Sequence, residues 1–384
     1  MAVRIQDRPV IYIRAVQLHD APYYLAAAKS SRFASLNFPA TLPAMEAKIG
    51  RSQRSFRGEI AQPGDREYVF TIFAGTGTEA VPVGTSTFYP KHGTPYQPHT
   101  AWDVIRNTKE VRGVSVPNDY LIFVLDHDGP AEVGAMVVHR LFQGRESVGR
   151  QVELMVDAAN HSLTVRGGYG RAGSWIRFFW AALPHNRDAF RGRLCISEFL
   201  APLNHHQDGR RSSPFYDALG TKFLGGRTYD EMDLATLSNR RLLTSHFPLV
   251  VRIARLPAPA QEVIGKVGED TKPAVKLLTD VGFRNSGRID VLDAGPHYVG
   301  AFDQNPIFTG ARELFYRGVV EGESSASVWH YGFIARSTPT GEFGFEACAA
   351  PYCLVEGGLL TTGEVAETLR LSPDDEMTVS AFPG

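Results

Sequence analysis

A strand, a glycine turn and a helix are predicted in succession by Gln151-Val-Glu-Leu-Met-Val-Asp157, Val165-Arg-Gly-Gly-Tyr-Gly170-Arg-Ala-Gly173 and Ser174-Trp-Ile-Arg-Phe-Phe179. In the first segment apolar residues recur at every second position, which is the period of a half-buried strand. The last segment has the length and composition of a helix. The glycines between them predict a turn at the start of that helix.

The glycine turn has two interpretations. A helix that begins on glycines presents unpaired backbone N–H groups and the positive end of its dipole, and the missing side chains let a polyphosphate come close. Glycines between a strand and a helix also form ordinary tight turns. The spacing alone does not separate the two, so an anion-binding site and a simple turn both stay open.

The composition is that of a soluble globular protein. At 384 residues the chain exceeds one typical domain, so two or three packed units are expected. Hydrophobic residues make up 43% and aromatic residues 11% of the chain, which is enough for a sizeable core. The formal net charge of -1 shows no basic excess that would indicate a nucleic-acid partner. No apolar run approaches the roughly 18 residues of a membrane span, and the N-terminus lacks the apolar core of a signal peptide.

The three cysteines, Cys195, Cys348 and Cys353, predict neither a disulfide framework nor a zinc site. Their number is odd and no Cys-x-x-Cys spacing occurs. Cys195 lies in an apolar strand, which favours an inert thiol. We therefore expect a cytoplasmic protein that holds no metal.

The chain before residue 151 changes from helices to strands. A strand is predicted at 10–16, and helices are predicted from Pro22 and Thr41. Runs rich in β-branched and aromatic residues predict strands at 67–73, 83–88, 120–125 and 133–138. Together with the glycine-opened helix, these elements predict an α+β fold.

The elements after the turn are predicted in the same way. A buried strand is expected at 193–200, helices at 212–220, 259–267 and 270–281, and a strand at 288–292. From about Pro296 onwards, short apolar and aromatic runs predict a small β-rich C-terminal subdomain. We therefore divide the chain into residues 10–295 and 296–384.

Six blocks of the sequence carry a resemblance to one known family. They are Ile13-Arg-Ala-Val16, His19-Asp20, Ser213-Pro-Phe-Tyr-Asp-Ala-Leu-Gly220, Val263-Ile-Gly-Lys-Val267, Leu277-Leu-Thr-Asp-Val-Gly-Phe283 and Ile289-Asp-Val-Leu-Asp-Ala-Gly-Pro296. In this order, with the glycine turn between the second and the third, they resemble the bacterial arginine N-succinyltransferases, which are members of the GNAT superfamily of CoA-dependent acyltransferases. The resemblance implies a GNAT-like mixed sheet flanked by helices, with the CoA-binding core at about residues 120–225.

The resemblance also implies where acyl-CoA binds. In the superfamily the pyrophosphate lies at a helix start, which is where the glycine turn falls here. Gly168 and Gly170 match both glycine positions of the family's phosphate loop, whereas Val165 departs from its first position and Arg166 lies one place late. The implied CoA contacts, with succinyl-CoA as a possible donor, are Leu154, Val156, Arg166, Gly168, Gly170, Arg171 and Gly173.

The resemblance weakens where the family binds its acceptor amine. The family motif Val-Ile-Gly-Gln-Val-His-Pro contains a histidine assigned as a proton carrier, and Gly268 stands in its place here. The family stretches Pro-Trp-Tyr-x-Tyr-Arg and Ala-Glu-Met-Arg-Gly correspond to residues 95–102 and 197–201, and both arginines are missing. Because arginine binds carboxylates in a bidentate manner, these losses predict a small-molecule amine acceptor other than arginine.

Three residues are candidates for proton transfer. An amine that attacks a thioester must lose a proton, and Glu198, alone on an apolar strand, is the first candidate base, with a pKa that burial should raise. Glu198 could instead pair with a buried arginine or cap a helix. His246 resembles a family His-Pro pair, and Tyr216 could protonate the leaving thiolate, but structural roles are open for both. The adjacent His205 and His206 favour a solvated loop over a metal site, because neighbouring side chains point apart.

Two functions of different classes remain open. The first is a CoA-dependent N-acyltransferase that moves an acyl group by direct attack to the amine of an amino acid or a related small molecule. An inert Cys195 favours this direct transfer over an acyl-enzyme route. The second is a non-catalytic subunit or acyl-CoA-binding partner of a related acyltransferase. Because relatives of the family can occur as paired α and β chains, the resemblance implies a homodimer or a hetero-oligomer with a related chain.

Overall fold

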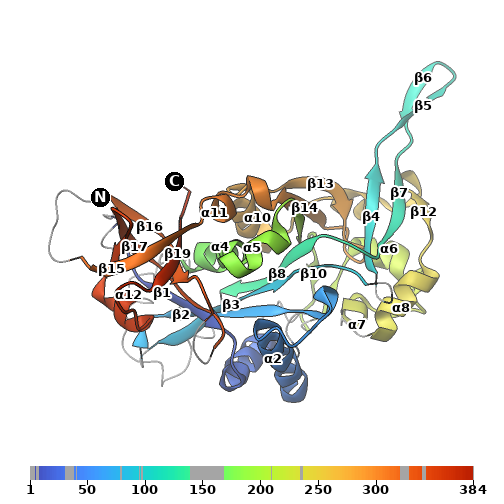
Figure 1. Cartoon of the computed structure of the whole chain (residues 1–384). Helices are drawn as coiled ribbons and strands as arrows, with labels where there is room; N and C mark the ends of the chain where they lie inside the picture. Colours follow the sequence, from blue (N-terminus) through green and yellow to red (C-terminus); the bar gives the residue numbers. More distant parts are fainter. Residues whose placement is uncertain are drawn as a thin grey trace.

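One continuous sheet runs through the molecule in the computed structural model (Figure 1). The structure describes residues 5, 8–30, 39, 41–77, 80–94, 96, 98–138, 168–208, 210–233, 237–320, 328–339 and 343–383. Within these ranges fifteen strands are joined in the order β12 (Val250–Arg252), β7 (Tyr120–Asp126), β4 (His99–Ile105), β13 (Arg284–Ile289), β14 (Pro296–Ala301), β9 (Leu194–Glu198), β8 (Ala131–Val138), β3 (Val81–Tyr89), β2 (Tyr68–Ala74), β1 (Ile11–Ala15), β17 (Glu346–Val355), β16 (Trp329–Arg336), β19 (Glu376–Ala381), β15 (Arg312–Val319) and β18 (Gly358–Thr361). Two small hairpins stand apart from this sheet: β5 (Thr108–Val111) with β6 (Val114–Pro117), and β10 (Asn204–His205) with β11 (Arg211–Ser212).

Helices pack against this sheet, which confirms the α+β class. They are α1 (Ala21–Ser30), α2 (Leu42–Phe56), α4 (Tyr169–Ala182), α5 (Pro184–Phe190), α6 (Pro214–Phe223), α7 (Tyr229–Asp233), α8 (Leu237–His246), α9 (Ala258–Val263), α10 (Lys272–Thr279), α11 (Pro306–Thr309) and α12 (Gly363–Thr368). Within the described part of the chain, no helix is both long enough and apolar enough to cross a membrane.

Strand β2 shows why helices cover both faces of the sheet. Its side chains alternate: Phe70 and Ile72 pack in the core that contains α4, whereas Val69 packs against α1 and α2. Successive strand residues point to opposite faces, so a strand that is buried along its whole length must be covered on both sides. Figure 1 accordingly shows α4 and α2 on opposite sides of β2 and β3.

The close approach of α4 to the sheet depends on a glycine. A Cβ on Gly173 would lie 2.4 Å from the Cδ1 atom of Ile72. On the same helix the buried guanidinium of Arg177 donates hydrogen bonds to the carbonyl of Ser174 at 3.0 Å and to that of Gly134 on β8 at 3.2 Å. Helix α4 is therefore held directly against β2 and β8.

Strands β8 and β9 are neighbours that separate soon after they meet. They run parallel and are in register at two positions, Ala131 with Cys195 and Glu132 with Ile196. Strand β8 continues to Val138 along β3, whereas β9 continues to Glu198 along β14. A gap in the hydrogen-bond ladder therefore opens between β8 and β9, and in the chain α4 lies between these two strands.

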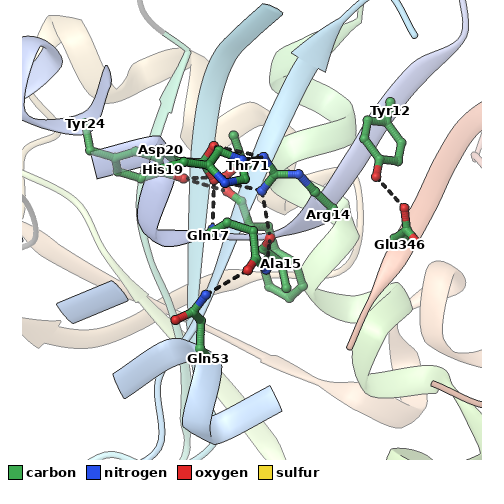
Figure 2. A network of polar contacts seen from close by, with 11 residues as sticks. Tyr12, Arg14, Ala15, Gln17, His19, Asp20, Tyr24, Gln53, Thr71 and Glu346 are labelled. Atoms are coloured by element: carbon green, nitrogen blue, oxygen red, sulfur yellow. Dashed lines mark hydrogen bonds and ion pairs between the residues drawn. The ribbon is translucent and has the colours of Figure 1, made fainter. Parts of the chain in front are cut away.

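A buried polar network joins β1, β2 and the short helix η2 (Leu18–Asp20), as Figure 2 shows. Arg14 Nη1 and Nη2 donate to the Asp20 carboxylate at 2.7 and 2.9 Å. The same carboxylate accepts hydrogen bonds from the backbone N–H of Gln17 and from the Thr71 hydroxyl. The Arg14 and Asp20 side chains are only 6% and 2% exposed, so this pair belongs to the core.

Two further cores lie towards the ends of the sheet. Helices α6, α7, α8 and α9 pack on β4, β7 and β13 around Trp102, Phe215 and Tyr216. At the other end, strands β15 to β19 and α12 enclose Leu359, Val365 and Met377. The proposed boundary at residues 295/296 falls between β13 and β14, which are hydrogen-bonded neighbours, and it stays a prediction.

The predicted strand Gln151–Asp157 lies outside the described residues and stays a prediction; the described strand that precedes α4 in the chain is β8. Elsewhere the structure differs from several predicted elements. Strands β4, β5 and β6 were not predicted; β5 and β6 form an exposed hairpin that projects from the body in Figure 1. Strand β13 ends at Ile289, because Asp290 to Ala294 form a turn in which the Asp290 carboxylate accepts backbone hydrogen bonds.

Candidate functional site

The residues predicted to bind CoA divide into two groups. Leu154, Val156 and Arg166 lie outside the described residues, and their roles stay predictions. Gly168, Gly170, Arg171 and Gly173 all lie at the start of α4. The predicted helix is present, but it begins at Tyr169, inside the stretch predicted to be a turn, so Gly170 and Gly173 belong to the helix.

Helix α4 begins on a glycine in the left-handed conformation. Gly168 has a φ of 80°, which a side chain would strain, and its carbonyl accepts the N–H of Ala172 at 2.9 Å. The preceding N–H groups of the turn have no carbonyl within the helix. A Cβ on Gly170 would make only ordinary contact, 3.9 Å from Leu277, so this position tolerates substitution without disturbing the helix. Gly173 is different, because its close neighbour is Ile72 in the core.

Glu198 lies in a cluster with two histidines that the sequence did not connect with it. Its Oε1 atom is 2.6 Å from Nε2 of His99 and 3.5 Å from Nε2 of His297. The two histidine side chains are 6% and 1% exposed, whereas Glu198 keeps 31% of its side chain exposed. We call these three residues the His–Glu cluster.

The His–Glu cluster lies on three strands of the sheet, β4, β9 and β14. His297 on β14 and Glu198 on β9 are direct partners in an antiparallel pair, so their side chains share one face. His99 is the first residue of β4, which pairs with β13 only at Trp102 and Asp103. The start of β4 therefore extends past the end of β13, and from there the imidazole of His99 reaches Glu198.

The charges of the cluster are coupled. Burial by itself would lower the pKa of His99, but the carboxylates of Asp126 and Glu198 raise it to about 10. His99, and with it Arg288, holds the pKa of Asp126 at about 2. Burial lowers the pKa of His297 to about 4. Near neutral pH, His99 is thus a cation between two carboxylates and His297 is a neutral imidazole.

The expectation of a raised pKa for Glu198 is wrong. Burial would raise it, but the electrostatic effect of His297, which acts at low pH where that imidazole is charged, and the hydrogen bond from His99 outweigh burial and hold the pKa below its ordinary range. Neither of the structural alternatives, a buried arginine or a helix cap, accounts for Glu198. Its partners are histidines, and the carboxylate is ionised and partly open to solvent.

Two ion pairs border the His–Glu cluster. His92 contacts the carboxylate of Glu132 on β8, and its ring packs on the ring of His99 with centroids 4.5 Å apart. On the other side, Arg288 Nη1 donates to Asp126 at 2.5 Å. The cluster is therefore continuous, through Glu132, with the point at which β8 and β9 separate.

The other two predicted catalytic residues do not join this cluster through any contact. The Tyr216 side chain is buried on α6, its hydroxyl donates to the carbonyl of Arg227 at 2.9 Å, and burial raises its pKa to about 12. His246 is the exposed last residue of α8, and its Nδ1 lies 3.3 Å from the carbonyl of Leu242. Both environments fit the structural interpretations, and the catalytic roles of these two residues stay predictions.

Gly268 stands where the family carries its histidine, and the backbone here is crowded. Its N–H donates to the carbonyl of Leu200 at 2.8 Å. A Cβ on Gly268 would lie 2.9 Å from the carbonyl oxygen of Ala201 and 3.1 Å from that of Leu200. A histidine at this position would therefore require the segment after Glu198 to move.

Two further sets of residues weighed in the sequence are exposed histidines and buried cysteines. His205 and His206 lie on or beside the exposed β10–β11 hairpin, where His206 Nε2 is 3.0 Å from the hydroxyl of Ser212. Cys195, Cys348 and Cys353 are buried, and burial raises the thiol pKa of Cys195 and Cys348.

Comparison with known proteins identifies the family. A family model described as "Arginine N-succinyltransferase beta subunit" matches residues 11–156 and 165–305. The arginine N-succinyltransferase subunit beta of Pseudomonas aeruginosa is 25% identical over 289 residues, which are 74% of this chain and 74% of that protein. The subunit alpha from the same organism is 23% identical over 290 residues, covering 75% of this chain and 76% of that protein. The arginine N-succinyltransferase of Photorhabdus laumondii is 24% identical over 295 residues, covering 74% and 75%.

A solved structure shows the same fold. It is described as arginine/ornithine succinyltransferase subunit AI from Pseudomonas aeruginosa, and it matches with a TM-score of 0.71 over 98% of this chain and 100% of that chain. At 18% identity this likeness is evidence for the fold alone. The family match covers most of the chain, so this protein belongs to the arginine N-succinyltransferase beta subunit family.

Proposed function

We propose that this protein is a CoA-dependent N-acyltransferase that moves an acyl group directly from acyl-CoA to the amine of a small molecule. Succinyl-CoA is the first donor to consider, because the relatives are named succinyltransferases. The observation that carries the proposal is the ionised, partly exposed Glu198 in the His–Glu cluster, next to the separation of β8 and β9.

The proposed donor half of the site is a GNAT-like sheet. The splayed parallel pair β8 and β9 and the glycine-opened start of α4 support acyl-CoA binding between the two strands, with the pyrophosphate at Gly168 and Gly170. Past Glu132, the described part of β8 has no further paired position with β9. We propose backbone N–H groups of this part of β8 as donors to the oxyanion of the tetrahedral intermediate.

The chemistry requires one proton acceptor in addition to solvent. An acceptor that arrives as an ammonium ion first gives one proton to solvent, and the neutral amine then attacks the thioester carbon. The C–N bond forms, the C–S bond breaks, and the thiolate of CoA leaves and takes a proton from solvent. As the C–N bond forms, the attacking nitrogen gains positive charge and its N–H becomes acidic, so even a carboxylate with a depressed pKa can accept that proton. Glu198 first orients the amine through its negative charge and then receives the proton.

The acceptor is proposed to be an amine other than arginine. Gly268 supplies no proton carrier, and the crowding around it excludes a side chain. The negative charge of Glu198 suits an ammonium group, whereas the missing arginines remove bidentate partners for a carboxylate. A polyamine or an amino acid with a different carboxylate contact fits these conditions.

Assembly and location follow the same reasoning. Relatives are named as subunits alpha and beta, which supports an oligomer of this chain with itself or with a related chain. We propose cytoplasmic location and the division of the chain at residues 295/296, with acyl transfer in the first part and the β-rich subdomain in the second.

A two-way screen tests the proposal. Acyl-CoAs of different chain length and charge are combined with amino-acid and polyamine acceptors, and free thiol and product mass are measured. Acceptor-dependent thiol release with a product of the expected mass supports acyl transfer. Acyl-CoA binding without turnover for any acceptor, by the chain alone, would instead support the alternative of a non-catalytic subunit.

A further inference from the structure

His297 carries a buried nitrogen that lacks a hydrogen bond. Its side chain is 1% exposed, and Nε2 has no hydrogen-bond partner among the described residues. The nearest charged atom is Oε1 of Glu198 at 3.5 Å, with a geometry that falls short of a hydrogen bond. A buried nitrogen without a partner is unfavourable, so its orientation towards Glu198 calls for a ligand between the two groups.

The surroundings of His297 supply a set of metal ligands. Nε2 of His99, a carboxylate oxygen of Glu198 and a ring nitrogen of His297 all lie within 4.8 Å of one another. In tetrahedral zinc sites the ligand atoms are about 3.3 Å apart, as follows from metal–ligand bonds of about 2.0 Å. The separation of 3.5 Å between His297 and Glu198 already fits, and the contact of 2.6 Å between His99 and Glu198 has to widen.

The residue next to the proposed ligand His99 also matches the surroundings of known metal sites. A metal-bound imidazole usually directs its other nitrogen at a carboxylate. Here Nδ1 of His99, which is buried and lacks a hydrogen bond, faces the carboxylate of Asp126 at 4.0 Å. The ligands sit on three strands of one sheet, β4, β9 and β14, so their backbones are fixed before any ion arrives. The exposed part of Glu198 provides an entry path and an open coordination position.

We propose that His99, His297 and Glu198 bind one divalent transition-metal ion of the zinc class. Two imidazoles and one carboxylate suit zinc, cobalt or nickel, whereas magnesium and calcium prefer sites built from oxygen ligands alone. The ion gives the buried nitrogen of His297 a partner, displaces the Nε2 proton of His99 to solvent and replaces the direct contact between His99 and Glu198. The adjacent pair His205 and His206, for which a solvated loop was expected, takes no part.

Metal binding would have a consequence for acyl transfer. The ion occupies the carboxylate that the proposed function gives to the acceptor amine, so zinc should inhibit competitively with the amine and leave acyl-CoA binding unchanged. This consequence rests on the proposed function. The binding of the ion does not, and it is measured without any substrate.

The test uses the full chain after removal of metals with a chelator. Zinc is titrated calorimetrically, the visible absorption of added cobalt is recorded, and the thermal unfolding temperature is measured with and without zinc. We expect one equivalent bound with a micromolar or lower Kd, cobalt bands of a four- or five-coordinate site, and a higher unfolding temperature with zinc.

Variants assign the site. Glu198→Gln and His297→Gln should each weaken zinc binding by 10-fold or more, and Glu198→Gln should also weaken the cobalt bands. The matched control is the double variant His205→Asn with His206→Asn, which should bind zinc like the unchanged protein. If His297→Gln does not fold, the partly exposed Glu198→Gln carries the same comparison. Zinc binding that survives Glu198→Gln, that is lost in the control, or that is absent from the unchanged protein would overturn the proposal.

Discussion

The replacement of Glu198 by glutamine tests the proposed chemistry most directly. The amide keeps the volume of the side chain and can still accept the hydrogen bond that His99 donates at 2.6 Å. It removes the negative charge that would hold an ammonium group and the atom that would receive its proton. Because Glu198 ends β9 and is 31% exposed, this change should not disturb the sheet.

The expected loss is large for turnover and small for donor binding. A positioned base contributes about 10²-fold or more to rate, which corresponds to about 2.7 kcal/mol of transition-state stabilisation. Acyl-CoA affinity should stay within about 2-fold, since the proposed pyrophosphate site lies at the start of α4. Thiol release under saturating acyl-CoA gives kcat and the KM of the amine, and calorimetry gives the affinity for CoA.

A matched control separates chemistry from a general effect of losing a carboxylate. Glu346 on β17 also pairs through its carboxylate, with the hydroxyl of Tyr12 at 2.5 Å and with Arg370 at 2.6 Å, and its side chain is 12% exposed. Glu346→Gln should leave turnover unchanged. If Glu198→Gln folds, binds acyl-CoA and turns over within a few fold of the unchanged protein, Glu198 is a structural residue and the proton goes elsewhere.

Four further results are expected. Gly170→Asp should weaken CoA binding at least 10-fold, because the new carboxylate repels the phosphates. The thermal unfolding temperature of the ligand-free protein should stay nearly unchanged, because position 170 has room for a side chain. Equal CoA affinity of both proteins in calorimetry would show that the glycine turn does not bind the pyrophosphate. Succinyl-CoA with arginine should give little product in steady-state assays, and robust formation of N-succinylarginine would refute the proposed acceptor class. Asp20→Asn should lower the free energy of unfolding, measured in urea, by about 3–5 kcal/mol, because Arg14 is left as an uncompensated buried charge. A loss below about 1 kcal/mol would contradict the prediction that this ion pair stabilises the core. In chelator-containing buffer, the pKa of His99 is raised to about 10, so the contribution of His99 to the free energy of unfolding is full below pH 6.5 and is lost as the pH rises towards 10. His99→Gln should therefore flatten this decline in stability by a few kcal/mol. Parallel curves of stability against pH for both proteins would exclude this contribution.

Much of the fold was visible in local patterns of the sequence. Thr41 and the apolar spacing after it predicted α2, which indeed starts at Leu42 with Thr41 as its N-cap. The strands β1, β2, β3, β7 and β9 were found from their apolar and β-branched runs, and α4 from the glycines before it. These signals are local, because a strand or helix repeats its buried face every two or every three to four residues along one segment.

The candidate site was only partly visible. Glu198 was found because a lone carboxylate on an apolar strand is conspicuous, but its pKa was predicted in the wrong direction. His297 directly follows the block that ends at Pro296, and His99 lies in the segment compared with the family, yet neither position indicates its partner. The sequence shows only that these two histidines lie close to segments that carry the family resemblance.

The reason lies in the distance along the chain. His99, Glu198 and His297 are separated by about one hundred residues each, and they meet because β14 pairs with β9 while the start of β4 extends past the end of β13. Strand order and register depend on packing between segments that are remote in the chain, and the periodicity within one segment carries no information about that packing. The pKa of Glu198 follows from that packing, since burial alone would raise it and only the neighbouring imidazoles lower it.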